Sequence, residues 1–281
     1  MCDKTLSHWA AAKRYREEKE QNMSTENLLV EIGEDFVATI TLNRAKELNT
    51  FNTHLARELV AALEGLDQEA RARVIILKGT GKAFCAGIDV KEFFGKTATE
   101  YRAWIENMEK PLVTIGRMRT PVIAQVQGVA AANGAGLVAA ADLAVAADNA
   151  RIGLTAINVG LNCVGPVIPV SRSVGRKRAL EMLFFGELLK AREALEMGLV
   201  NKVVPADELE AETRRWAAQL AKKSPVALQI AKKAFYASAD MDYTQAFEYM
   251  NEAFARLCTT EDATEGVKAF LDRRNPEWKE K

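Results

Sequence analysis

The sequence has few of the residues on which histidine-based and metal-based chemistry depends. Of its 281 residues, two are histidines, His8 and His54, and His54 falls in the apolar repeat of a predicted helix, where we expect a structural role. The four cysteines are widely spaced and form no CxxC pair. Zinc sites and disulfide frameworks usually show such pairs, so we predict neither, and two histidines argue against a Ser-His-Asp triad.

The chain also lacks an excess of either charge and any long apolar run. Its 38 Lys and Arg residues balance 38 Asp and Glu residues, which leaves no electrostatic footprint for nucleic acid or an anionic membrane. No stretch approaches the roughly 20 apolar residues of a membrane span. Residues 1–22 have no apolar signal-peptide segment, and they contain acidic residues, which transit peptides avoid. We therefore expect a cytoplasmic protein with no nucleic-acid or membrane partner.

Strand-like and helix-like patterns alternate through the first two thirds of the chain. Apolar residues at helical spacing predict helices over 53–66 and 99–118. Short β-rich or continuously apolar runs predict strands over 28–32, 36–44, 73–80, 121–130 and 142–154. This order predicts an α/β fold.

Helical patterns dominate after residue 169. Amphipathic segments occur over 175–186, 191–198, 208–223, 242–257 and 261–274. Another helix is predicted after Ser224 and Pro225, an N-cap residue followed by proline at the first helical position. We accordingly divide the chain into a charged helical extension (1–22), an α/β core (23–195) and a helical C-terminal region (196–281).

Three segments have compositions that packing alone explains poorly. Residues 82–92 contain a turn at Gly87 before Asp89, which is either a capped tight turn or a helix start whose free N–H groups bind an anion. Residues 128–137 are small, which allows close helix packing or close approach of a helix N-terminus to a ligand. Residues 151–161 offer Thr155 and Asn158, which either satisfy the loop backbone or take part in catalysis.

In this order and spacing, the segments resemble the crotonase (enoyl-CoA hydratase/isomerase) superfamily. The supporting motifs are NRAKELNTF at 43–51, KAFCAGIDVKEF at 82–93, PVIAQVQG at 121–128, the small-residue segment with Asp142, AREALEMGLVNKVVP at 191–205 and EGVKAFLDRR at 265–274. The resemblance extends over about residues 28–278. It implies a crotonase-like ββα spiral core and a helical C-terminal region that drives homotrimers, often paired into hexamers.

The resemblance also implies a ligand and the residues that hold it. The ligand is an acyl-CoA thioester, with no cofactor apart from the coenzyme A of the substrate. Its carbonyl is expected to accept hydrogen bonds from the backbone N–H groups of Ile88 and of Asn133, which stands where relatives usually have glycine. Losing one donor of such an oxyanion hole typically costs about 3–4 kcal/mol. The positions that correspond to CoA contacts are Lys46, Glu47, Ala86, Asp89 and Val90.

One departure from the family pattern bears on the reaction. Hydratases of the family use two glutamates for acid–base chemistry, and the corresponding positions here, which line the substrate site, are Gly136 and Ala156. Other polar groups are candidates for their role, namely Thr155, Asn158, Asn162, Cys163, Tyr101 and Glu106. Cys163 has no histidine placed to activate it, which argues against a nucleophilic role.

Three functions are consistent with these residues. The first is a hydratase-like lyase or isomerase that stabilises an enolate-like intermediate. The second is thioester hydrolysis or decarboxylation through the same oxyanion hole. The third is non-catalytic binding of an acyl-CoA.

Overall fold

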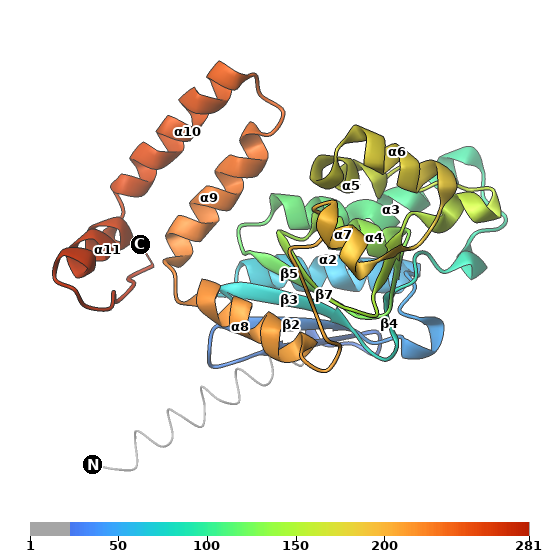
Figure 1. Cartoon of the computed structure of the whole chain (residues 1–281), viewed down its shortest axis with the longest axis horizontal. Coiled ribbons are helices and arrows are strands. Elements are labelled where there is room, and N and C mark those ends of the chain that lie inside the picture. Colours follow the sequence, from blue (N-terminus) through green and yellow to red (C-terminus); the bar gives the residue numbers. More distant parts are fainter. Residues whose placement is uncertain (1–22, 281) are drawn as a thin grey trace, which may run out of the picture.

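Ten strands form two sheets in residues 23–280, which are the part of the chain described by the computed structural model (Figure 1). The expected extension 1–22 lies outside these residues. The large sheet has the order β1 (Leu28–Ile32), β2 (Val37–Leu42), β3 (Val74–Gly79), β5 (Val122–Val126), β7 (Leu143–Ala147) and β10 (Lys202–Val204). The small sheet has the order β4 (Ala83–Cys85), β6 (Val129–Ala131), β8 (Arg151–Gly153) and β9 (Leu189–Lys190). β1 and β9 pair antiparallel with their neighbours, and every other pairing within the two sheets is parallel.

From β3 on, the chain winds as a spiral in which each turn has a strand in the large sheet, a strand in the small sheet and then a helix. The successive turns are β3, β4 and α3 (Ala98–Arg117), then β5, β6 and α4 (Asn133–Ala140), then β7, β8 and the 3₁₀ helix η3 (Thr155–Val159). This arrangement is the ββα spiral that we expected.

Two of the predicted strands are wrong in one respect. Segments 121–130 and 142–154 each contain two strands that lie in different sheets. In the first segment the break falls at Gly128, where φ is +56° and an added Cβ would lie 1.9 Å from the carbonyl oxygen of Lys82. In the second, a turn at Asp148 and Asn149 separates the strands. An apolar run shows that a segment is buried, but not that it changes sheet.

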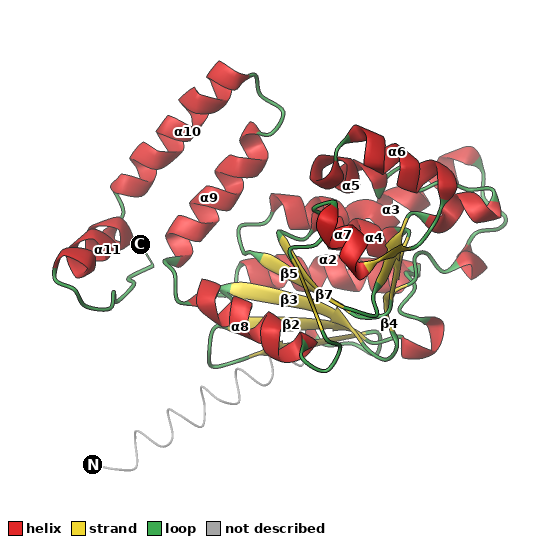
Figure 2. Ribbon diagram, viewed as in Figure 1, coloured by secondary structure: helices red, strands yellow, loops and turns green. Residues whose placement is uncertain are grey.

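Helices cover both faces of the large sheet (Figure 2), which explains why its strands are apolar on both sides. In β3, Val74 and Ile76 face α8 (Leu209–Ala221), whereas Ile75 and Leu77 belong to the main core with α2 (Thr53–Asp67). The remaining helices of the core are η1 (Ala45–Glu47), η2 (Val90–Glu92), α5 (Val167–Val174), α6 (Arg176–Phe185) and α7 (Ala191–Glu196).

The sheet-bound part ends later than the expected boundary at residue 196. β10 pairs with β7, and α8 packs on β3, β5 and β7, so both belong with the core. The helices that project away from the sheets are α9 (Pro225–Ser238), α10 (Tyr243–Cys258) and α11 (Glu261–Leu271) (Figure 1). Within residues 23–280, none of the helices is long and apolar enough to cross a membrane.

A buried ion pair joins α9 to the large sheet. The Nζ of Lys232 lies 2.7 Å from Oδ2 of Asp142, which directly precedes β7, and also donates to the carbonyl oxygen of Thr120 at 2.9 Å. The hydroxyl of Tyr236 donates to the other carboxylate oxygen of Asp142 at 3.0 Å. Burial lowers the pKa of Lys232, although the attraction of Asp142 acts in the opposite direction. The first of the projecting helices is thus fixed to the core by polar contacts.

Candidate functional site

Two backbone turns meet at the edge of the small sheet. Gly87 follows β4 with φ of +107°, and Ala132 follows β6 with φ of +50°. β4 and β6 are parallel neighbours, so their carboxyl ends lie side by side. A Cβ added to Gly87 would lie 3.1 Å from Cβ of Ala132. The residues that follow these two positions are Ile88 and Asn133, so the structure brings the two predicted oxyanion donors together.

The N–H group of Ile88 is left without a partner by the way its turn is held. Phe51 donates its N–H to the carbonyl oxygen of Gly87 at 2.8 Å and accepts from the N–H of Asp89 at 2.7 Å. These bonds use the residues on either side of Ile88. No acceptor within residues 23–280 takes the N–H of Ile88.

Asn133 begins α4, so its N–H belongs to the first turn of the helix, which has no intrahelical acceptor. The N–H has no acceptor elsewhere in the described part of the chain. The side chain is buried and turned toward α3, where its Nδ2 donates to the carbonyl oxygen of Met108 at 3.0 Å. An asparagine at this position therefore leaves the main-chain donor free.

The close approach of the two turns requires glycine at position 134. A Cβ there would lie 2.0 Å from the carbonyl oxygen of Cys85 at the end of β4, and backbone atoms cannot move aside as a flexible side chain can. Overpacking typically costs about 1–3 kcal/mol, and we expect Gly134→Ala to lower the free energy of unfolding by about 3 kcal/mol or more. The measurement is urea unfolding followed by circular dichroism.

Gly116→Ala is the matched control for this prediction. Gly116 lies in α3, and a Cβ there meets nothing within 4 Å. Alanine is a better helix former, so we expect this variant to gain about 0.5–1 kcal/mol. Equal stability of the two variants would contradict the packing argument.

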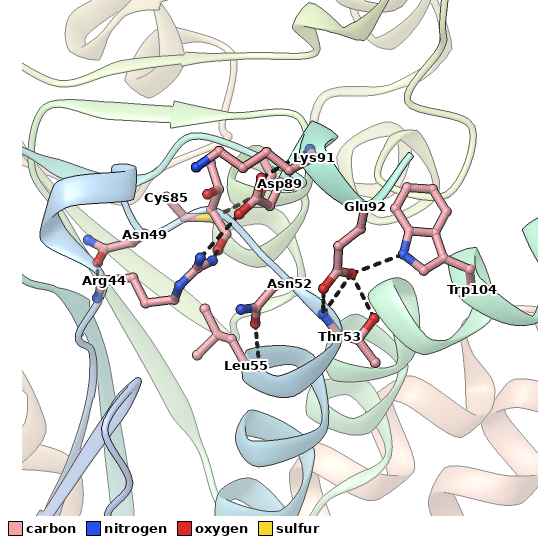
Figure 3. A network of polar contacts seen from close by, with 12 residues as sticks. Arg44, Asn49, Asn52, Thr53, Leu55, Cys85, Asp89, Lys91, Glu92 and Trp104 are labelled. Atoms are coloured by element: carbon pink, nitrogen blue, oxygen red, sulfur yellow. Dashed lines mark hydrogen bonds and ion pairs between the residues drawn. The ribbon is translucent and has the colours of Figure 1, made fainter. Parts of the chain in front are cut away.

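The loop after β2 and the loop after β4 form one rim beside these turns (Figure 3). The guanidinium of Arg44 lies 3.1 Å from the carboxylate of Asp89, and Ala86 donates its N–H to Leu48 at 3.0 Å. Burial acts to raise the pKa of Asp89, but the hydrogen bonds from Arg44 and from the N–H of Lys91, together with the positive charges of both residues, outweigh it and the pKa is lowered. These contacts gather the residues predicted to touch CoA, of which Lys46 and Val90 are exposed and Glu47, Ala86 and Asp89 are partly exposed.

The helix expected to start after Asp89 is only the three-residue 3₁₀ helix η2. Asp89 does cap it, accepting from the N–H of Lys91 at 3.2 Å, as the capped-turn interpretation predicts, and the free N–H of Ile88 lies just before this cap. The sequence did not reveal the role of Glu92, which accepts from the N–H and hydroxyl of Thr53 and from Nε1 of Trp104 (Figure 3). Glu92 thereby joins the start of α2 to α3.

Gly136 and Ala156 have different surroundings. Gly136 is buried, and an added Cβ would lie 3.0 Å from Cβ of Pro166 and 3.1 Å from Cδ1 of Leu112. Pro166 and Leu112 therefore crowd any side chain introduced at position 136. Ala156 is partly exposed and packs against the main core.

The polar candidates around these positions mostly serve the local structure. Asn158 is exposed, and its Nδ2 donates to the carbonyl oxygen of Gly186 at 2.9 Å, which joins η3 to the end of α6. Asn162 accepts from the N–H of Cys163 at 2.8 Å. Thr155 is partly exposed at the start of η3. Asn158 and Asn162 thus satisfy loop backbone groups, the structural alternative considered above for Thr155 and Asn158.

Burial makes the thiols near the site unreactive. It raises the pKa of Cys85 to about 12 and also raises the pKa of Cys163, and a thiol in that state is a poor nucleophile. Among residues 23–280, no group of three or more His, Cys, Asp or Glu side chains could hold a metal ion.

The two remaining candidates both lie on α3 and have local partners there. Tyr101 packs in an aromatic cluster with Phe93 and Trp104. Glu106 is exposed and forms an ion pair with Arg102.

Sequence reasoning missed Glu109, which lies on α3 beside Gly165 in the loop before α5. Its side chain is partly buried, and burial raises its pKa. A Cβ added to Gly165 would lie 1.8 Å from Oε1 of Glu109, so the carboxylate occupies the space above that glycine. The sequence did contain a signal for Glu109. It adjoins the apolar stripe of Ile105, Met108 and Leu112, which places its carboxylate at the edge of the helix face that packs on the core.

Comparison with known proteins decides the family. The model of the enoyl-CoA hydratase/isomerase family matches residues 33–281. The chain belongs to this family. A human relative named "Enoyl-CoA hydratase domain-containing protein 3, mitochondrial" is 36% identical over 245 residues, which is 87% of this chain and 81% of that protein. The "Probable enoyl-CoA hydratase echA8" of Mycobacterium tuberculosis is 34% identical over 91% of this chain and 99% of its own length.

Solved structures of the family agree with the fold. The enoyl-CoA hydratase of Mycobacterium smegmatis matches with a TM-score of 0.88 and 37% identity, over 90% of this chain and 99% of that chain. Human enoyl Coenzyme A hydratase domain-containing protein 3 matches with a TM-score of 0.86 and 35% identity, over 90% of this chain and all of that chain. The predicted crotonase-like α/β fold is thereby confirmed.

Proposed function

We propose that this family member binds an acyl-CoA thioester and stabilises enolate-like negative charge on its carbonyl oxygen. The observation that carries the proposal is the contact between the turns at Gly87 and Ala132, each followed by an N–H group with no acceptor in the described residues. Two fixed donors aimed at one oxygen stabilise charge there without reorganising, and each typically contributes about 3–4 kcal/mol. The rim formed by the loops after β2 and β4 is the proposed seat of the CoA group.

The reaction is proposed to be a lyase or isomerase reaction on the acyl chain next to the thioester. The chain has no carboxylate at Gly136 or Ala156, where the family pattern places the hydratase glutamates. Ordinary hydration is therefore expected to be slow, even though relatives are named enoyl-CoA hydratases. Chemistry that needs the oxyanion hole but fewer acid–base groups is favoured, and thioester hydrolysis, decarboxylation and non-catalytic binding remain alternatives.

The assembly and setting of the protein are part of the same proposal. We expect homotrimers or paired trimers, with no cofactor besides the coenzyme A of the substrate, in the cytoplasm. Exposed aromatic residues on α10, which include Phe247 and Phe254, support contacts between copies, since α10 buries none of its side chains within the described chain. The mammalian relatives carry "mitochondrial" in their names.

Calorimetric titration with crotonyl-CoA, with free CoA as the reference ligand, tests the proposal. We expect the thioester to bind, and Gly87→Ala to weaken its binding about tenfold, because the added Cβ pushes against Ala132 and displaces one donor. Gly95→Ala is the control: Gly95 also has a positive φ, +79°, but a Cβ there meets nothing within 4 Å. Failure of the unmodified protein to bind crotonyl-CoA would overturn the proposed function.

A further inference from the structure

We propose that Glu109 of α3 is the proton-transfer group of this site. The proposal rests on the proposed function, since it assigns Glu109 to the thioester held at Ile88 and Asn133. No carboxylate is available at positions 136 and 156 to move a proton. Glu109 lies on a different helix, α3, and its carboxylate reaches Gly165, next to the Pro166 that contacts position 136.

Contacts between α3 and α4 place Glu109 near the donors. Its neighbour Met108 accepts a hydrogen bond from the side chain of Asn133 at 3.0 Å. Leu112, one helical turn further along α3, lies 3.1 Å from a Cβ built on Gly136. Glu109 therefore lies on the stretch of α3 that packs against the first turn of α4.

The loop before α5 makes room for this carboxylate. Gly165 has no side chain, and a Cβ there would lie 1.8 Å from Oε1 of Glu109. The next residue, Pro166, fills the space beside Gly136 instead. Of these two adjacent loop residues, Gly165 thus leaves space for a carboxylate from α3, whereas Pro166 crowds one from α4.

Glu109 lacks the partners that other partly buried carboxylates of the site have. Asp89 is paired with Arg44, and Glu92 accepts from Thr53 and Trp104. Within residues 23–280, Glu109 accepts no hydrogen bond and forms no ion pair. A carboxylate that is partly desolvated and unpaired lowers stability, and such groups concentrate at functional sites.

The proposed step needs no group beyond Glu109 and the two donors. The ionised carboxylate removes a proton from the carbon next to the thioester carbonyl. The electron pair of the C–H bond forms a carbon–carbon double bond, and the negative charge moves to the carbonyl oxygen that faces Ile88 and Asn133. The protonated Glu109 then returns the proton to the same carbon, or to the far end of a conjugated system, which moves the double bond. The second transfer restores the carboxylate, so atoms and charge balance.

Incubation with 3-hexenoyl-CoA in deuterated water tests this assignment. Mass spectrometry reports deuterium uptake next to the carbonyl, and absorbance reports formation of the conjugated 2-enoyl thioester. We expect Glu109→Gln to slow both about 10²–10⁴-fold with unchanged calorimetric affinity for 3-hexenoyl-CoA, because a general acid–base group contributes that much to rate but little to binding. Glu106→Gln is the control, because Glu106 is exposed and paired with Arg102 one turn earlier on α3.

The pH dependence separates a proton-transfer role from a structural one. Burial alone raises the pKa of Glu109, and its neighbours Leu112, Gly165 and Pro166 carry no charge. The other titratable side chain of this loop, Cys163, is a thiol whose pKa is also raised. The exchange rate should therefore rise with pH as Glu109 ionises, above the usual carboxyl range, and Glu109→Asp should keep this rise at a lower rate. Glu109→Gln should abolish it.

The pH dependence of the free energy of unfolding is an independent test, because the raised pKa of Glu109 fixes the direction of the change. Because the folded-state pKa of Glu109 is raised, the folded protein binds more protons than the unfolded chain between the two pKa values, and stability from this group falls as pH rises through that window. Glu109→Gln removes that loss, so its melting temperature at neutral pH should equal or exceed that of the unmodified protein.

The outcomes distinguish the two proposals. No binding of 3-hexenoyl-CoA to the unmodified protein overturns the proposed function. Intact binding with no exchange, or with equal exchange in the unmodified protein and Glu109→Gln, overturns the assignment of Glu109 alone.

Discussion

The purified protein is expected to hydrate crotonyl-CoA at least about 10²–10⁴-fold more slowly than a family member with both glutamates. Gly136 and Ala156 supply no acid or base, and Glu109 can at most replace one of the two groups. Loss of the enone absorbance measures the rate. A rate close to that of ordinary hydratases would contradict the importance that we give to these two positions.

Restoring the glutamates is a sharper form of the same test. The sequence alone favours Gly136→Glu with Ala156→Glu, but the structure shows that a Cβ at position 136 would already be crowded by Pro166 at 3.0 Å and Leu112 at 3.1 Å. We expect this double variant to be destabilised and to stay inactive. Adding Pro166→Gly removes the 3.0 Å contact with the Cβ of Pro166, although those with its Cα at 3.2 Å and with Leu112 remain, so the triple variant should be less destabilised and hydrate faster than the double variant.

Lys232→Met is expected to lower the free energy of unfolding by about 3–5 kcal/mol, because it leaves the carboxylate of Asp142 desolvated without its cation. The Lys232 side chain is 6% exposed and that of Asp142 17%. Urea unfolding at neutral pH measures the change.

The exposed pair between Arg172 and Asp240 is the matched control for Lys232→Met. Its side chains are 53% and 75% exposed, so Asp240→Ala should cost at most about 1 kcal/mol. If both variants lost the same small amount, the polar link between α9 and the sheet would not be a major source of stability.

Sequence patterns located most of the helices well because their ends carry local signals, although the short helices α4 and α5 were not predicted. Ser224 caps α9 by accepting from the N–H of Ala227, and Pro225 follows at the first helical position as expected. α2 and α3 begin and end within about a residue of the predicted ranges 53–66 and 99–118. Apolar periodicity and caps depend on residues that are close together in the sequence, so they can be recognised without knowing how the rest of the chain folds.

The site itself could be predicted only through the family resemblance. Nothing local in the sequence indicates that Gly87 touches Ala132, or that Gly134 approaches the carbonyl of Cys85. Whether position 136 has room for a carboxylate depends on Pro166, from another segment, and the sequence could not show it. Such contacts depend on how strands register between turns of the spiral, which side-chain periodicity does not encode.

The position of the two donors in the spiral has a consequence for how the site comes into being. Ile88 lies between β4 and α3 of one turn of the spiral, and Asn133 begins the helix of the next turn, with all of α3 between them in the sequence. Contacts between residues so far apart in the sequence close large loops. The chain loses conformational entropy when the loop closes, before the contacts can stabilise it, so such contacts form late in folding. The proposed oxyanion hole therefore has no precursor in an isolated hairpin or helix, and thioester binding should return during refolding only when consecutive turns of the spiral have docked.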